Sequence, residues 1–160
     1  MTPHITTLSE KKLAGLHLRM SLTENKTALL WHSFMTRRKE IPNVIGTDLY
    51  SLQLYAPSYF DNFNPANEFD KWAAVEVSSF DHLPDGFEAI TLPSRLYAVF
   101  THTGGPARGP QTVGYIFGTW LPSSGYRLDN RPHFERLGAQ YSNDDPHSEE
   151  EIWIPVKAKE

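Results

Sequence analysis

The order of apolar and polar positions in the first half of the chain predicts a strand, a helix and two more strands. Residues 10–22 are predicted to form a strand, because every second position from Ala14 to Leu22 is apolar, as in a strand with one buried face. Apolar residues in 24–39 then recur at helical spacing, and Pro42 ends that helix. Strands are predicted at 48–56 and 71–80, with a loop rich in Pro, Asn and Asp between them.

The second half of the chain repeats this order. Residues 87–103 are extended and are interrupted at Pro93. Residues 108–121 carry apolar side chains at helical spacing, and strands are predicted at 132–141 and 149–156. The two halves therefore have the same succession of elements.

Short sequence echoes support an internal duplication. The segment LYSLQLY at 49–55 corresponds to FERLGAQY at 134–141, and KWAAVEVS at 71–78 corresponds to EIWIPVKA at 151–158. We therefore predict an α+β fold of duplicated strand-helix-strand-strand units. The units are expected to form one curved antiparallel sheet with two main helices on one face, and a ligand cleft at the pseudo-two-fold seam.

The composition indicates a single domain, 1–160, whose pseudo-repeat halves are about 1–80 and 83–158. The chain has no cysteine, which excludes a disulfide scaffold and thiol catalysis. It has no apolar run of about 18 residues, so no membrane span is predicted. The N-terminus lacks the apolar core of a signal peptide, and we expect a cytoplasmic protein.

Charge and histidine spacing narrow the set of partners. The net charge of −4 argues against nucleic acid as a direct partner and favours cationic ligands. The seven histidines are scattered without the helical spacing of a metal site, so neither metal nor cofactor is expected. The acidic residues at 144–145 and 149–151 are predicted to form a solvated loop.

One carboxylate occupies an unusual place in a predicted strand. By alternation, Glu135 shares a face with Leu137 and Ala139, while Arg136 points the other way. A carboxylate on an apolar face is costly unless something pairs with it. Glu135 is therefore a rim residue satisfied by a nearby Arg or Tyr, a receptor for a positive charge, or a general acid. The alternation does not choose among these three roles.

The chain is rich in aromatic residues, with four Trp, seven Tyr and nine Phe. Such a supply fits an aromatic core. It equally fits a ring-lined pocket, because ligand sites favour aromatic walls with a few placed polar groups.

Four stretches in combination resemble the GyrI-like small-molecule-binding domain, also called the AraC-type bacterial effector-binding domain. KWAAVEV at 71–77 fits the same fold. The four matching stretches are LPDGFEAITLPSRLYAVFTHTG (83–104), TVGYIFGTWLPSSGY (112–126), RPHFERL (131–137) and EEIWIPV (150–156).

The resemblance implies a pocket for amphipathic, cationic, ring-bearing molecules, with a buried Glu at its base. The matching position is Glu135. It also implies a stand-alone member without a DNA-binding domain, whose partner is a small molecule and which is compatible with a homodimer. Other stand-alone members resemble a gyrase-modulating protein or hydrolyse reactive cyclopropane toxins with a pocket Glu. We expect a binding protein rather than an enzyme, and these alternatives stay open.

The predicted site consists of Glu135, which would also be the catalytic residue of an enzyme, and six aromatic wall residues. At least three of the six are expected to line the largest cleft. Glu76, the other carboxylate within a strand, is the next candidate for the anionic group. The six rings are Trp72, Tyr97, Phe117, Trp120, Tyr126 and Trp153.

Overall fold

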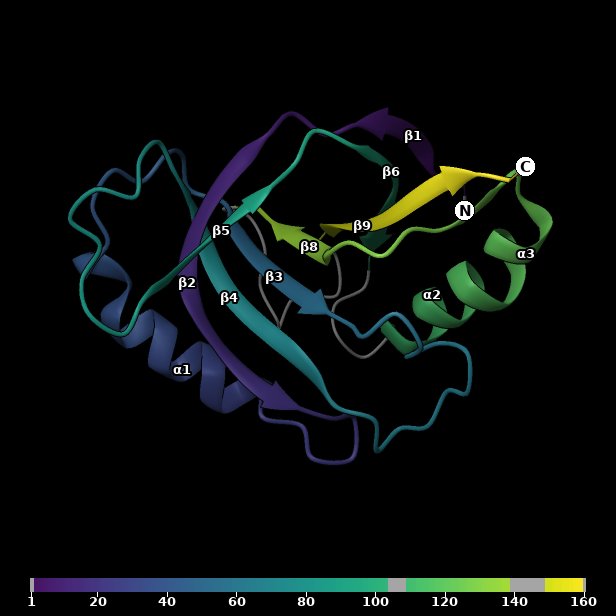
Figure 1. Ribbon diagram of the computed structural model, residues 1–160, viewed down its shortest axis with the longest axis horizontal. Coiled ribbons are helices and arrows are strands. Elements are labelled where there is room, and N and C mark those ends of the chain that lie inside the picture. The colour runs from purple at the N-terminus through teal and green to yellow at the C-terminus, as the bar shows by residue number, and fades with distance from the viewer. Residues whose placement is uncertain (1, 104–108, 139–148, 160) are drawn as a thin grey trace.

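The computed structural model describes residues 2–103, 109–138 and 149–159. Within these ranges the chain forms nine strands and two helical segments (Figure 1). The helical segments are α1 (Thr27–Arg37), which continues as the 3₁₀ turn η1 (Arg38–Glu40), and a second run made of α2 (Gly109–Tyr115), the π-helical turn η3 (Ile116–Trp120) and α3 (Leu121–Ser123). The strands are β1 (His4–Thr7), β2 (Lys11–Met20), β3 (Leu49–Leu54), β4 (Phe69–Val77), β5 (Glu88–Leu92), β6 (Leu96–Thr103), β7 (Tyr126–Leu128), β8 (His133–Leu137) and β9 (Glu149–Ala158).

The strands form a curved antiparallel sheet, which confirms the predicted α+β class. Its order is β1-β6-β9-β8-β3-β4-β2-β5, and β7 pairs with β9 outside this path. The first half contributes β3, β4 and β2 as neighbours, and the second half contributes β8, β9 and β6 in the mirrored order. The two halves meet where β3 pairs with β8.

The two halves exchange their leading strands at the edges of the sheet. β1 precedes β2 in the chain but pairs with β6 of the second half. β5 precedes β6 but pairs with β2 of the first half. Each half is therefore completed by a strand from the other, which ties the duplicated units into one sheet.

Strand pairing places both helical segments on the same face of the sheet, as predicted. Leu30 and Phe34 of α1 pack with Ala73 of β4. Ile116 of η3 packs with Ile152 of β9. Because directly opposite residues share a face, one row crosses this helix-bearing face from β2 to β6, consisting of Leu16, Ala73, Ser51, Glu135, Ile152 and Phe100.

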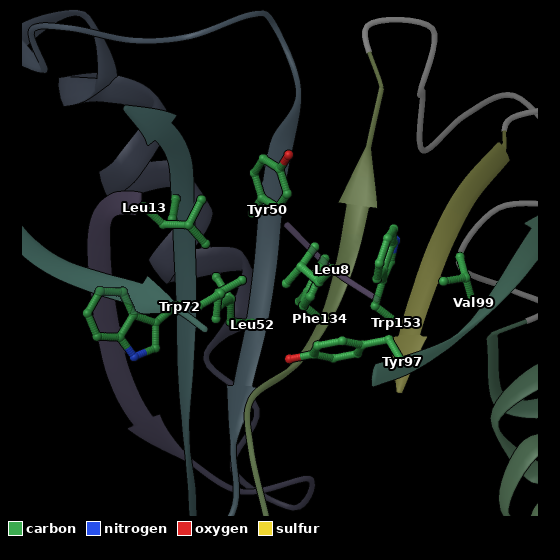
Figure 2. Packing of buried hydrophobic residues seen from close by; sticks show 11 residues of the cluster. Leu8, Leu13, Tyr50, Leu52, Trp72, Tyr97, Val99, Phe134 and Trp153 are labelled. Carbon is green, nitrogen blue, oxygen red and sulfur yellow. The ribbon is translucent and has the colours of Figure 1, made fainter. Parts of the chain in front are cut away.

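The opposite face carries the aromatic core of the molecule (Figure 2). Phe134 and Trp153 stack there with ring centroids 5.2 Å apart. Leu8, just after the edge strand β1, and Leu92, in the edge strand β5 at the other end of the sheet, belong to the same core cluster. The sheet therefore curves around this core, which accounts for its strongly bent outline in Figure 1.

Several element boundaries differ from the predicted ones. α1 begins at Thr27 rather than at residue 24, where Oδ1 of Asn25 accepts the backbone N–H of Thr27 at 2.9 Å. Strands β1 and β7 were not predicted, because segments of four and three residues are too short to show alternation. Ala139, expected on the face of Glu135, lies outside the described residues.

Candidate functional site

Polar side chains gather at the seam between the two halves, on the helix-bearing face. Ser51 lies directly opposite Glu135, and Gln53 lies opposite His133. In the sheet, β3 and β8 lie between the strands under α1 and those under the second helical segment, and Figure 1 shows the two helical segments flanking them. The seam is thus a polar strip between two apolar, helix-covered regions.

Two buried polar atoms of this strip have no hydrogen-bond partner in the described part of the chain. They are Oε2 of Glu135 and Nε2 of Gln53. One is an acceptor and the other is a donor, and their residues are diagonal neighbours across the paired strands. Leaving such groups unpaired costs folding free energy, and a ligand offering complementary groups would satisfy both.

A second carboxyl group lies next to Glu135. Glu150 on β9 is opposite Leu137, one position along the same face from Glu135. Burial and, to a smaller extent, the charge of Glu135 raise the pKa of the Glu150 carboxyl, which Lys71 lowers in part, and the net result is about 7. Residues 149–151 form the start of strand β9, so the prediction of a solvated acidic loop is wrong for them. Positions 144–145 lie outside the described residues.

Tyr55, just after β3, lies close to the same carboxylate. Burial raises the pKa of its phenol, and the charge of Glu135 raises it further. Tyr55 therefore keeps its proton. Its ring meets that of His133 edge-on at 4.9 Å.

Three rings from three separate elements form a stack beside these polar groups. Phe60, from the loop after β3, lies parallel to Phe117 of η3 at 5.2 Å and to His133 of β8 at 5.7 Å. Burial, followed by the charge of Arg131, lowers the pKa of His133 to about 3, so the imidazole is neutral. We call the following set the seam site: Gln53, Tyr55, Phe60, Phe117, His133, Glu135 and Glu150.

The structure separates the six predicted wall rings into two groups. Phe117 belongs to the seam site. Trp120 and Tyr126 stack on each other at 6.3 Å on the same side of the sheet, where Trp120 meets Phe100 of the helix-bearing face edge-on. The others, Trp72, Tyr97 and Trp153, are buried in the core of the opposite face (Figure 2).

Glu76, the alternative anionic candidate, also lies on the opposite face. It pairs with Leu13 of the aromatic core across β2 and β4, and its carboxylate is 3.6 Å from the ammonium of Lys11. The structure therefore does not bring Glu76 together with Glu135.

Most residues of the seam site were missed by sequence reasoning. The alternation of Gln53 with Tyr55, and of His133 with Glu135, places each pair on one strand face and was available in the sequence. Glu150 and Phe60 come close to the other residues of the seam site only through strand pairing and loop placement, for which the sequence holds no local signal.

Tyr55, Phe60 and His133 also line a pocket of about 180 Å³ beside the seam site. None of the six predicted wall rings lines this pocket. The other residues around it are Ala56, Pro57, Asp61, Leu128, Asp129, Asn130 and Arg131.

Two absences hold for the residues that the structure describes. No group of His, Asp or Glu among them is arranged to hold a metal ion. No helix within the same ranges is long and apolar enough to cross a membrane.

The duplicated sheet with both helical segments on one face is the fold of the GyrI-like class of effector-binding domains. Residues 4–156 match the family described as Cass2, integron-associated effector binding protein, and the chain belongs to this family. The resemblance noted in the sequence is thereby confirmed.

Individual relatives agree with this assignment. The transcriptional regulator BrlR of Pseudomonas aeruginosa is 26% identical over 129 residues, which are 79% of this chain and 45% of BrlR, so the chain spans about half of that relative. The structure of SAV2435 bound to tetraphenylphosphonium superposes with a TM-score of 0.75 at 17% identity, covering 98% of this chain and 94% of the other. The integron cassette protein VCH_CASS2 of Vibrio cholerae gives 0.67 at 18% identity, covering 98% and 97%. At these identities the two structures show a shared fold.

Proposed function

We propose that this protein binds amphipathic, cationic, aromatic small molecules at the seam site, and that Glu135 anchors the positive charge. The observation that carries the proposal is the buried, partnerless Oε2 of Glu135 beside the stacked rings of Phe60, Phe117 and His133. Because Oε2 has no hydrogen-bond partner in the described part of the chain, it can accept a hydrogen bond or a positive charge from a ligand.

The chemistry of the site suits such a ligand. A carboxylate shielded from water attracts a cation more strongly than an exposed one, because the effective dielectric constant is lower. Each aromatic face adds cation–π attraction of about 0.5–2 kcal/mol. Glu150 contributes further negative charge when it is ionised. The rings offer broad apolar contact with little directional demand, which suits several ligands of one chemical class.

The relatives support the same class of ligand. The family is described as effector-binding, and SAV2435 of similar fold was solved with tetraphenylphosphonium, a cation surrounded by four phenyl rings. That ligand is therefore a suitable first probe for this chain.

Titration calorimetry with tetraphenylphosphonium tests the proposal. Glu135→Gln keeps the side-chain shape and removes the charge, so it should weaken binding of the cation by roughly 2–4 kcal/mol. Triphenylphosphine oxide, which is neutral, should lose much less. Glu76→Gln, in a strand but on the opposite face, is the matched control and should leave both affinities unchanged. Equal losses for both ligands in Glu135→Gln would show that the carboxylate is structural.

Hydrolysis is a second candidate, favoured by one observation. Glu150, with its pKa raised to about 7, lies beside Glu135, and a carboxyl group that titrates near neutral pH suits general acid–base chemistry. Mass spectrometry of ligand recovered after incubation separates the two functions, because a binding protein returns it unchanged. Gyrase modulation, the lack of direct contact with nucleic acid, and a homodimer stay predictions.

A further inference from the structure

Four neighbouring strands across the seam each place one polar side chain on the helix-bearing face. In the sheet order β4-β3-β8-β9, which can be followed in Figure 1, these side chains are Lys71, Gln53, Glu135 and Glu150. Lys71 lies directly opposite Gln53, and Gln53 lies opposite His133, two positions from Glu135 on the same face. The first half of the chain therefore contributes a cation and an amide to this set, and the second half contributes two carboxyl groups.

Lys71 is a half-buried cation on the side of the first half. It shares the helix-bearing face with Ala73, two positions further along β4. Its ammonium group forms no ion pair or hydrogen bond with any residue that the structure describes. By contrast, Lys11 on the opposite face pairs with Glu76. The ammonium of Lys71 can therefore pair with a ligand without breaking an internal bond.

Glu150 is the matching half-buried group on the side of the second half. Within the described ranges its carboxyl group also has neither an ion pair nor a hydrogen bond. The charge of Lys71 lowers the pKa of Glu150 in part, so the two groups lie near enough to interact although they do not meet. Glu135 belongs to the strand between them, and its backbone is two strands from that of Lys71, which is roughly 10 Å. The charges of the face are therefore divided, with the cation at one side of the seam and the carboxyl groups at the other.

This division of charge discriminates between kinds of ligand. A ligand with only a positive charge is attracted by Glu135 and repelled by Lys71. A ligand that also carries a carboxylate replaces this repulsion by a second, charge-assisted contact with Lys71. The two attractions act together only when both charges belong to one molecule.

We propose that the seam site prefers zwitterionic ligands, in which an aromatic cation is bound beside Glu135 and Glu150 and a carboxylate of the same molecule is bound by Lys71. This inference rests on the proposed function, which requires only the cation, and it names the ligand class more closely. Because neighbouring strands are about 4.8 Å apart, the two charges of the ligand should be separated by roughly 5–10 Å.

Two phosphonium probes that differ in one charge test the inference by calorimetry. Both are triphenylphosphonium ions with a butyl arm, which ends in a carboxylate in one probe and in the ethyl ester of that carboxylate in the other. The measurements are made at pH 8.5, where Glu150 is ionised. The native protein should bind the zwitterion about three- to tenfold more tightly than the ester, which is the effect of one partly buried ion pair.

Three lysine variants assign this preference to one side chain. In Lys71→Gln the affinity ratio of zwitterion to ester should fall to one or below, because the ligand carboxylate then meets only the carboxylates of the site. Lys71→Arg keeps the charge and should keep the preference. Lys12→Gln is the matched control, since Lys12 lies on the same face at the far end of β2, over the ring of Phe80, and its loss changes the net charge equally. Glu135→Gln should weaken both probes and keep the preference for the zwitterion.

The possible failures are distinguishable. Binding of the ester as tightly as the zwitterion by the native protein would overturn the zwitterion preference and leave the cation site standing. A preference that persists in Lys71→Gln, or that is lost equally in Lys12→Gln, would overturn the role of Lys71. No measurable binding of these probes or of tetraphenylphosphonium would remove both the proposed function and this inference.

Discussion

Among the residues that the structure describes, Glu135 and Gln53 each have a buried polar atom without a hydrogen-bond partner, at the centre of a sheet whose other central positions are well packed. Evolution could have filled this place with apolar side chains, which would pack against Ala73 and Ile152 in the same row. Groups that reduce stability are commonly retained where they serve binding. At the residue scale, the seam site therefore has the character of a binding site rather than of a core.

Replacing Glu135 by an apolar residue should stabilise the protein in the absence of ligand. Glu135→Met removes the unsatisfied acceptor and should raise the free energy of unfolding by about 1–2 kcal/mol, measured by urea denaturation. Tetraphenylphosphonium should no longer stabilise this variant. Glu76→Met, which loses its partner Lys11, should not gain stability. A loss of stability in Glu135→Met would mean that the carboxylate holds the fold.

Glu150 should make stability depend on pH in a defined direction. Its pKa is raised from 4.5 to about 7 in the folded protein, so the folded state binds more protons between these values. The stability contribution of Glu150 is therefore fully present below about pH 4.5 and is lost as the pH rises through about 7. The free energy of unfolding of Glu150→Gln, relative to that of the native protein, should therefore rise by about 1–2 kcal/mol from pH 5 to pH 8.5. This energy is reduced to allow for the partial exposure of the carboxyl group.

Urea denaturation at the two pH values measures this difference. The comparison with the native protein is needed because His133, with its pKa lowered to about 3, contributes in the opposite direction: its stability is lost as the pH falls below about 6.5. Glu149→Gln is the control, because Glu149 immediately precedes Glu150 and is exposed. This variant should show no such gain in the free energy of unfolding. A constant difference between native and Glu150→Gln at both pH values would contradict the prediction.

At the scale of elements, the ring stack depends on a loop and a helix that belong to different halves. The second helical segment contains the π-helical turn η3, and such wide turns recur at functional sites. Ile116 of this turn is buried in the core under the helix, while its neighbour Phe117 reaches the stack. Phe60 reaches the same stack from the loop between β3 and β4. The loop and the turn together therefore form one wall of the site.

Removal of the loop ring should weaken binding while the fold persists. Phe60→Ala removes one face of the stack and should lower the affinity for tetraphenylphosphonium about tenfold, as measured by calorimetry. Phe63→Ala in the same loop is the matched control, because Phe63 is 53% exposed and its ring contacts Tyr59, which is not one of the three stacked rings. Equal effects of the two variants would place Phe60 outside the site.

At the scale of the whole molecule, the exchange of β1 and β5 makes the two halves dependent on each other. Without the second half, β1 loses β6 and β3 loses β8. Without the first half, β5 loses β2. Each half alone would expose unpaired strand edges and the apolar core around which the sheet curves. The seam site exists only when both halves are present.

Fragments 1–85 and 86–160, divided at the turn before β5, should therefore be unfolded when separate and should assemble when mixed. Circular dichroism should show sheet signal only in the mixture, and tetraphenylphosphonium should bind only there. Cooperative unfolding of either fragment alone would contradict the dependence inferred from the strand exchange.

The sequence by itself determined the local structure and the fold class. Side chains alternate faces along a strand and recur every three to four residues along a helix, so the pattern of apolar positions located β2, β3, β4, β6 and α1 without any partner being known. The repeated order of elements supplied the duplication and one sheet, and the matched stretches supplied the family. The same alternation placed Glu135 on one face with Leu137, and the structure puts that face under the helices.

Only the tertiary structure decided which faces meet. The echo of residues 71–78 with 151–158 equates Ala73 with Trp153, yet these lie on opposite faces, so the true correspondence is displaced by an odd number of residues. A shift of one residue reverses every side chain of a strand. Trp72, expected beside Glu135, lies together with Trp153 in the core of the opposite face. Glu150 and Phe60 approach Glu135 only through pairing and folding between distant segments, because local alternation carries no information about the partner strand.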